Sequence, residues 1–316
     1  MTNRKITDTL ENNFIPDNFW GTFHFLSAST FTAVAFYLSV NESHLIYAVS
    51  QVLLALSLLQ WIIILHEAGH ETLFRSRIAN LLSGHIAGTF ALLPYHSWKI
   101  VHQRHHVWIG WQDKDSTTAD LVPRKLKLFE KLAINFAWRS YFPLFSIVYR
   151  IKNYWYLPRM LGYIEKENHS TAIFSVLFFL VFYIFLIYIT GVNLIATSFL
   201  PGVFISFAIQ DPIILSQHTH IPQKLARNQT VKPFPHSEQG QFSRSLILPN
   251  WFSFLILHFD YHERHHLHPN VPGYYLHKLD VEQPNAVHWL TWLRGAKKLK
   301  GEVFLFRNQH DTGFNL

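Results

Sequence analysis

The stretch LIYAVSQVLLALSLLQWIIILHEAGH, residues 45–70, joins a long apolar run to a pair of histidines. The run up to residue 65 contains no Lys, Arg, Asp or Glu, and a helix of about 20 apolar residues is long enough to cross the hydrocarbon core of a bilayer. His66 and His70 follow four residues apart, so both imidazoles lie on one face if the helix continues. The stretch therefore predicts a membrane helix with two imidazoles at its end.

Similar uncharged runs occur elsewhere in the chain and predict further membrane spans. The connection between the first two runs and the connection between the last two are so short that each pair must form a helical hairpin. The last run contains Pro201 and Gly202, which predict a kink. The four predicted spans are residues 22–40, 45–65, 171–189 and 192–209.

Three other apolar stretches are predicted to lie at the membrane without crossing it. Residues 78–93 and 246–259 are too short to span comfortably and are predicted to be re-entrant or interfacial. Residues 129–156 mix basic and aromatic side chains, which is typical of a helix lying along the interface. The sequence thus predicts one all-α integral membrane domain over residues 1–316, with four transmembrane helices in two hairpins and a cytoplasmic helical cap.

Basic residues indicate the orientation of these spans. All 27 Lys and Arg lie outside the four spans and outside the short turns within the hairpins. By the positive-inside rule, both termini and the long central segment are predicted to be cytoplasmic. Cationic side chains facing anionic lipid headgroups then explain the net charge of +7. No nucleic-acid partner is expected, because basic and aromatic residues do not form a common patch.

The composition restricts the chemistry of any site. Hydrophobic residues make up 49% of the chain and charged residues only 15%, which argues against an ordinary soluble protein. The absence of cysteine excludes disulfides, thiolate zinc sites and cysteine-ligated iron–sulfur centres. The chain contains 21 histidines, about three times the usual content. Nitrogen and oxygen must therefore bind any metal.

Two further histidine motifs share one spacing. HQRHH contains His102, His105 and His106, and HERHH places histidines at the same offsets in residues 262–266. At this histidine frequency, two such matches are expected by chance in roughly 0.4% of chains. Both motifs lie on the predicted cytoplasmic side, where they could form one site with HEAGH. The motifs give eight candidate metal ligands: His66, His70, His102, His105, His106, His262, His265 and His266.

Eight imidazoles are more than one ion requires. A catalytic zinc is satisfied by three protein ligands and a water, so the set implies two ions. Imidazole binds Fe, Cu, Zn and Ni, and ligand type alone does not select among them. A pair of iron ions fits best on chemical grounds, because in an apolar membrane site its use is to activate O₂ against an inert C–H bond.

Two alternatives come from different classes of protein. HEAGH matches the H-E-x-x-H signature of zinc proteases, in which the glutamate is the general base. Such a membrane protease would leave HQRHH and HERHH without a role. A metal transporter would need ionisable residues inside the spans, and apart from His24 there are none.

The ordered set HxxxH, HxxHH, HxxHH with membrane hairpins resembles the membrane fatty acid desaturases of the histidine-box superfamily. PYHSWKIVHQRHH, residues 94–106, resembles the second-box region of acyl-lipid desaturases of the delta-12 and omega-3 type. QHTHIP, SEQGQFSRSLI and HERHHLHPNVPGYYLHKL resemble their C-terminal half, so that the likeness covers residues 65–279. The chain departs from the delta-12 pattern at Glu67 and Ala68, where those enzymes more often have Asp and Cys.

The resemblance implies a function and completes the candidate site. It implies that two iron ions and O₂ introduce a double bond into a fatty acyl chain carried by a lipid, CoA or acyl carrier protein. Hydroxylation, carotenoid ketolation or hydroxylation, and terminal-alkene formation share the ligand pattern and stay open as alternatives. A ferredoxin, rubredoxin or cytochrome b5 would supply electrons as a separate protein.

The family also has a further metal ligand just after the last span. In this chain that position corresponds to QHTH, in which His218 is favoured over His220. Metal-bound imidazoles usually donate their other N–H to a carboxylate or carbonyl. Glu67, Asp115 and Glu263 lie next to the motifs and are the candidates for this outer role.

Overall fold

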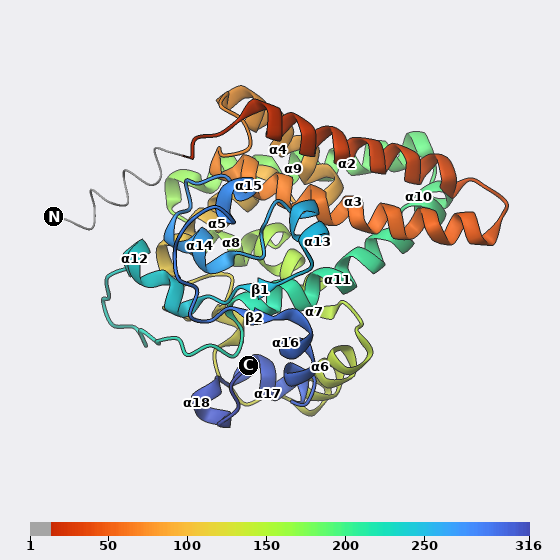
Figure 1. Ribbon diagram of the computed structural model, residues 1–316. Coiled ribbons are helices and arrows are strands. Elements are labelled where there is room, and N and C mark those ends of the chain that lie inside the picture. Colours follow the sequence, from red (N-terminus) through yellow and green to blue (C-terminus); the bar gives the residue numbers. More distant parts are fainter. Residues whose placement is uncertain (1–13) are drawn as a thin grey trace.

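The computed structural model describes residues 14–316, and most of them lie in helices (Figure 1). The prediction of an all-α class is confirmed at this level. β structure in named strands is limited, within these residues, to two parallel pairs formed by β1 (Leu246–Ile247) and β2 (Val287–His288). The longer helices are α2 (Asn18–Ser39), α3 (His44–His70), α4 (Arg77–Ala91), α5 (Tyr95–Trp108), α6 (Leu128–Ser140), α9 (His169–Thr190) and α11 (Leu200–His218).

Shorter helices connect and cover the long ones. They are α7 (Leu144–Arg150), α8 (Leu157–Leu161), α10 (Val192–Ser198), α12 (His236–Gln239), α13 (Asn250–Leu255), α14 (His262–Leu267), α15 (Gly273–Leu276), α16 (Trp289–Ala296), α17 (Gly301–Phe306) and α18 (Gln309–Thr312). Three 3₁₀ turns, η1 (Ala119–Leu121), η3 (Lys166–Asn168) and η4 (Gly240–Phe242), and one π-helical turn, η2 (Ile151–Trp155), complete the described chain.

Two described helices are long and apolar enough to cross a membrane, namely α3 and Lys166–Thr190, which includes α9. The pair α10 and α11 makes a third span if its two parts are counted together. α2 contains the first predicted span and is 22 residues long, but it is not among these helices. Its Ser, Thr and His residues lower its mean hydropathy.

The last predicted span is bent, as Pro201 and Gly202 predicted, but the break lies earlier. α10 and α11 meet at 43° around Phe199, and Pro201 then lies in the first turn of α11. Proline is tolerated there because its missing N–H has no partner within the helix in any case. α11 also continues past the predicted end at residue 209 to His218. The polar side chains of Gln210 and Asp211 find partners inside the protein, namely Arg150 and the Ser146 N–H.

Helix α3 lies at the centre of the bundle. It packs against α2, α4 and α11, and 67% of its most apolar window is buried, compared with 22% for the span that includes α9. Polar contacts fix its register against α2: Trp61 Nε1 donates to Thr32 Oγ1 over 2.8 Å, and that oxygen lies 2.6 Å from Ser57 Oγ. α2 and α3 run side by side (Figure 1). The HEAGH motif therefore forms the last turn of a largely buried helix.

The three stretches predicted to lie at the membrane without crossing it differ in structure. Residues 78–93 form most of α4, while residues 129–156 form α6, α7 and η2. Residues 246–259 are not one helix, because they contain β1, α13 and a tight turn at Leu257 and His258. Both turn residues have positive φ, 51° and 56°, which reverses the chain just before α14.

Candidate metal centre

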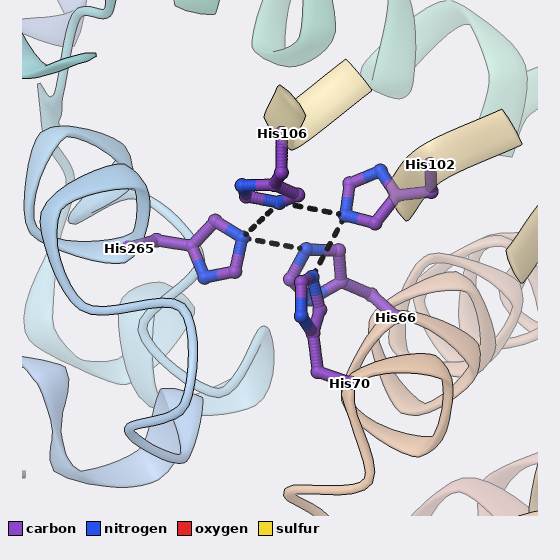
Figure 2. A group of neighbouring side chains, drawn as sticks. All are labelled: His66, His70, His102, His106 and His265. Atoms are coloured by element: carbon purple, nitrogen blue, oxygen red, sulfur yellow. Dashed lines mark hydrogen bonds between the residues drawn. The ribbon is translucent and has the colours of Figure 1, made fainter. Parts of the chain in front are cut away.

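Nine histidines from four helices converge on the side of the bundle where α3 and α11 end. Their candidate ligand atoms form two groups, and within each group all these atoms lie within 4.8 Å of one another. The five-histidine group consists of His66, His70, His102, His106 and His265, and the four-histidine group consists of His105, His218, His262 and His266. Figure 2 shows the five-histidine group, in which rings from α3, α5 and α14 point toward a common centre.

Helix geometry explains how each motif is divided between the groups. In an α-helix, residues i and i+4 are about 40° apart around the axis, whereas i+3 and i+4 are about 100° apart. His102 and His106 therefore enter the five-histidine group together, while His105 enters the other. In α14 the assignment is reversed, because the i and i+4 pair belongs to the four-histidine group and His265 to the five-histidine group.

The Nε2 atoms of the five-histidine group have the spacing of ligands around one ion. Nε2 of His265 lies 3.1 Å from that of His66 and 3.0 Å from that of His106. Nε2 of His102 lies 2.9 Å from that of His70 and 3.1 Å from that of His106. Two nitrogens about 2.1 Å from one ion and at right angles to each other are about 3 Å apart. The donor set, nitrogen facing nitrogen, therefore fits a metal ion.

The four-histidine group has the same spacing. Nε2 of His262 lies 2.9 Å from that of His218 and 3.1 Å from that of His266, and the last two are 3.2 Å apart. The His105 ring completes the group, with its centroid 4.8 Å from that of His218. These imidazoles, too, face one another without a carboxylate or hydroxyl between the Nε2 atoms, which suits a second ion.

Outer contacts with a carboxylate or a backbone carbonyl orient three of the rings. Nδ1 of His105 lies 2.7 Å from Asp115 Oδ2, and Nδ1 of His66 lies 3.0 Å from Glu67 Oε1. Nδ1 of His218 lies 3.0 Å from the carbonyl oxygen of Phe242. Such contacts fix the tautomer, so that Nε2 is left free to bind metal. Glu67 and Asp115 thus contact Nδ1 of a candidate ligand, and their role behind a bound metal stays a prediction.

Glu263 does not lie in such a position, and this expectation was wrong. Its carboxylate accepts hydrogen bonds from the backbone N–H of Ser245 at 3.1 Å and of Asn285 at 2.9 Å. Among the described residues no histidine nitrogen contacts it. The reason is that these two N–H groups, which precede β1 and β2, engage both of its carboxylate oxygens. Glu263 instead connects α14 to the loops that flank β1 and β2.

His220, the alternative to His218, lies outside both groups. The helix ends at His218, and the chain turns at His220, whose φ is 64°. Its Nε2 lies 2.8 Å from Thr312 Oγ1 and 3.2 Å from the carbonyl oxygen of Phe314. His218 faces the other imidazoles because it belongs to the last turn of α11, whereas His220 faces the C-terminal segment.

Burial keeps the imidazoles in the form that binds metal. For His102, His106, His262, His265 and His266, burial and then the neighbouring imidazoles hold the pKa well below its usual value. These rings are therefore neutral at pH 7, as a metal ligand must be. Burial opposes ionisation of Asp115, but the interaction with His105 and hydrogen bonds from Thr117 outweigh it and lower the pKa of this carboxyl.

Three residues of the site were missed by the sequence reasoning. Gln239 Oε1 lies 3.4 Å from Nδ1 of His266, and Gln239 Nε2 donates to the carbonyl of His106 over 2.8 Å. Thr117 Oγ1 lies 3.0 Å from Nδ1 of His105. Trp98 stacks on His102 with ring centroids 4.5 Å apart. Gln239 and Trp98 lie within the segments SEQGQFSRSLI and PYHSWKIVHQRHH, so a closer study of those motifs could have found them.

A small cavity adjoins histidines of both groups, and a larger cavity shares two lining residues with it. The smaller, about 80 Å³, is lined by histidines of both groups and by apolar side chains such as Ile63, Ile213 and Phe259. The larger, about 350 Å³, lies among α6, α7, α11 and the C-terminal segment. Thr117 and Tyr149 line both cavities. The two cavities are therefore neighbours, with Thr117 and Tyr149 in the wall of each.

Comparison with known proteins agrees with this site. Residues 42–292 match the family model described as fatty acid desaturase. The match covers most of the chain and includes all three histidine motifs. The chain therefore belongs to the fatty acid desaturase family.

Its curated relatives are desaturases that act on lipids or fatty acids by name. The chain is 22% identical to the sn-1 oleoyl-lipid 12-desaturase of Picosynechococcus sp. over 226 residues, which are 67% of this chain and 62% of that protein. It is 33% identical to the sn-1 acyl-lipid omega-3 desaturase (ferredoxin) of Synechocystis sp. over 84 residues, 26% of this chain and 22% of that protein. The Delta(12) fatty acid desaturase of Mortierella isabellina is 40% identical over 53 residues, 17% of this chain and 13% of that protein. The chain thus spans less than two thirds of the length of these relatives.

Proposed function

We propose that this protein is an O₂-dependent membrane desaturase that introduces a double bond into a fatty acyl chain. The observation that carries the proposal is the convergence of nine imidazoles in two groups beside an apolar cavity. Membership of the fatty acid desaturase family supports it. The five-histidine group and the four-histidine group would each hold one iron ion.

The bound iron pair would supply the oxidising power to activate O₂ against an unactivated methylene group. The protein contributes position and dryness. Asp115, Glu67 and the Phe242 carbonyl hold three imidazoles in orientation through their Nδ1 atoms. The apolar walls of the small cavity would keep one segment of an acyl chain beside the histidines and exclude water.

The contacts of Glu67 argue against the zinc-protease alternative. A protease of that class needs this glutamate as a general base at the metal. Here both carboxylate oxygens are engaged elsewhere: Oε1 contacts Nδ1 of His66, and Oε2 accepts from Thr72 Oγ1 at 2.7 Å and from the Gly273 N–H at 2.8 Å. Glu67 is 2% exposed and holds the loop before α15 against α3.

We propose four membrane crossings, with α2 as the partner of α3 in the first hairpin, and a cytoplasmic location for both termini and the histidines. The placement of every Lys and Arg outside the spans supports this orientation. Exposed apolar side chains on α6 suit a helix lying along the interface, among them Phe129 at 68% exposed and Phe136 at 67%.

The absence of cysteine makes this topology directly testable. Asn41→Cys, in the turn of the first hairpin, and Ser237→Cys, beside the candidate centre, each introduce a single thiol at an exposed position. In intact cells a membrane-impermeant maleimide should label Asn41→Cys, and it should label Ser237→Cys only after the membrane is opened. Labelling of both in intact cells would contradict the proposed orientation.

We propose a membrane lipid as the acyl carrier, since two of the relatives act on acyl lipids by name. Acyl-CoA and acyl carrier protein are the other carriers to compare. A separate electron donor is required: ferredoxin, which is named for one relative, or a rubredoxin or cytochrome b5.

The decisive experiment is expression in a host that lacks the activity, followed by mass spectrometry of its fatty acids. The wild-type protein should create a new double bond, and His105→Ala should abolish it. Hydroxylated or ketolated products, or terminal alkenes, would redirect the proposal to another oxidation. Unchanged lipids with a competent electron donor would contradict it.

A further inference from the structure

The larger cavity is apolar but has cationic side chains in its wall. Its lining includes Arg124, Lys152 and Lys297. Arg124 pairs with Glu130 over 2.8 Å, and Lys152 pairs with Asp120 over 3.0 Å. Lys297 has no carboxylate oxygen within 4.0 Å among residues 14–316. Among these three lining cations, Lys297 is therefore the one that has no direct counter-ion within the described residues.

Lys297 is held in place by aromatic rings. Its Nζ lies 3.8 Å from the ring centroid of Trp138 and 3.6 Å from that of Tyr141, and it donates a hydrogen bond to the Trp138 carbonyl. Tyr141 ends α6 with a φ of 58°, a left-handed conformation, and its ring lies against the ammonium. An ammonium has three N–H donors, so the aromatic rings and one carbonyl leave donors for a ligand.

The surroundings of Lys297 favour an anionic partner. The residue is half-buried, and burial lowers the pKa of its amine to about 8, although nearby Asp211 favours the charged form. Asp211 does not serve as the direct counter-ion, because neither of its carboxylate oxygens lies within 4.0 Å of Nζ, and its Oδ1 accepts the Ser146 N–H at 2.7 Å. An anion placed against Nζ would restore part of the solvation that the ammonium loses in this wall.

The large cavity also lies at a suitable distance from the histidines. Asp211 lines the large cavity and His218 lines the small one, and both belong to α11. Leu215, three residues before His218 and a rise of about 4.5 Å from it, also lines the large cavity. An acyl chain bound from Lys297 toward the imidazoles would pass Thr117 and Tyr149, which line both cavities.

We propose that Lys297, between Trp138 and Tyr141, binds the anionic oxygens of the acyl substrate and so fixes how far its chain extends toward the histidines. The group recognised is a phosphate or a carboxylate, which would come from a phosphodiester lipid or from a free fatty acid. This inference rests on the proposed function for the identity of the chain, while the anion site itself does not depend on catalysis.

Native mass spectrometry of the purified, iron-loaded protein tests the site without measuring activity. Phosphatidylglycerol, free oleate and uncharged monogalactosyldiacylglycerol, all with oleoyl chains, compete in equal amounts. The wild-type protein should bind an anionic ligand in preference to the uncharged lipid. Comparing phosphatidylglycerol with free oleate then shows whether the bound anion is a phosphodiester or a carboxylate. Lys297→Met and Lys297→Gln should lose this preference by about tenfold, as expected for a lost charge-assisted hydrogen bond.

Two further variants separate recognition from general effects. Lys297→Arg keeps the charge and should keep the preference. Lys298→Met removes the same charge from the exposed neighbouring residue, which does not line the cavity, and should bind like wild type. Iron content should be equal in all of these proteins, because Lys297 contacts no histidine of either group.

Kinetics distinguish the two proposals. In an active preparation, Lys297→Gln should raise KM for the anionic substrate about tenfold with little change in kcat. The anion site would be overturned if Lys297→Met and Lys297→Gln both form product and both keep the wild-type KM and the wild-type preference for anionic ligands. Anion binding that depends on Lys297, in a wild-type protein that forms no double bond with a competent donor, would overturn the proposed function and leave the site standing.

Discussion

The five-histidine group and the four-histidine group differ in the hydrogen bonds that their imidazoles make through Nδ1, on the side away from the facing Nε2 atoms. In the four-histidine group three rings have an outer partner at Nδ1: His105 contacts Asp115, His218 the Phe242 carbonyl, and His266 Gln239. In the five-histidine group His66 has such a contact, with Glu67, and His70 and His102 are partly exposed. Surrounding hydrogen bonds thus orient most rings of the four-histidine group. The five-histidine group has fewer such contacts and one more imidazole.

This difference indicates separate tasks for the two positions. Five imidazoles nearly fill six-coordinate geometry, whereas four leave more positions for water, O₂ or substrate, as catalytic metal sites do. Histidines of both groups line the small cavity, but three of its five belong to the four-histidine group. An ion with few protein ligands depends more strongly on each of them, and this gives an order of expected effects.

The largest effect is expected from removing a ligand of the four-histidine group. His218→Ala leaves three imidazoles and should lower iron from about two ions per chain to about one, with activity reduced by a factor of 100 or more. His220→Ala is the matched control, since this ring contacts Thr312 and Phe314. Metal analysis of both purified variants checks the prediction, and equal iron loss in the two would break the distinction between the groups.

A smaller effect is expected from replacing Asp115, whose carboxylate contacts the His105 ring of the four-histidine group. Asp115→Asn weakens the 2.7 Å contact with Nδ1 of His105 and should lower iron affinity or activity by about 10- to 100-fold. Iron retained during dialysis against a graded series of chelator measures this change. Wild-type retention would show that the His105 tautomer is fixed by Thr117 alone.

The corresponding change behind the five-histidine group should matter less. Glu67→Gln keeps an oxygen for Nδ1 of His66, and four other imidazoles hold the same ion, so we expect a loss of about tenfold or less. The same chelator series on Glu67→Gln and Asp115→Asn compares the groups directly. A greater loss in Glu67→Gln would reverse the assignment of the more open position.

The smallest effect concerns packing behind His102. A Cβ on Gly69 would lie 2.4 Å from the Trp98 ring, which stacks on His102. Gly69→Ala should therefore lower stability by roughly 1–3 kcal/mol, with partial loss of activity. In Gly162→Ala, the nearest atom to the new Cβ is a carbonyl oxygen at 3.3 Å, and this variant is the control. Thermal unfolding in detergent measures both, and an unchanged midpoint for Gly69→Ala would count against a packing role for Trp98.

The sequence predicted which histidines come together better than how they are arranged. Spacings of three and four residues predicted that each motif presents its imidazoles on one helical face. They did not predict that His105 would lie with His262 and His266 rather than with His102 and His106. How the histidines of each motif are divided between the two groups depends on how α5 and α14 face each other. That relation is set by tertiary packing, which residue spacing within one helix does not contain.

The fold was predictable where apolar length decided it and less so where polar residues found internal partners. The uncharged run before His66 correctly predicted α3. The fourth predicted span ended at residue 209 because it had to be free of charged residues, whereas α11 continues to His218, with Gln210 and Asp211 satisfied inside the protein by Arg150 and Ser146. Glu263 was misassigned because the Ser245 and Asn285 N–H groups engage its carboxylate, and these contacts cannot be read from its position beside His262 in the sequence.

The contact between His66 and His265 joins residues 199 positions apart in the chain. An ion shared by these rings would act as a removable cross-link that closes a very long loop, and loop closure of this kind restricts the unfolded chain. Stripping the ions would also leave a set of inward-facing nitrogens without partners in the protein interior. Chelation should therefore loosen α5 and α14 against the end of α3, while the α2–α3 hairpin, which is held by Trp61 and Thr32, stays folded.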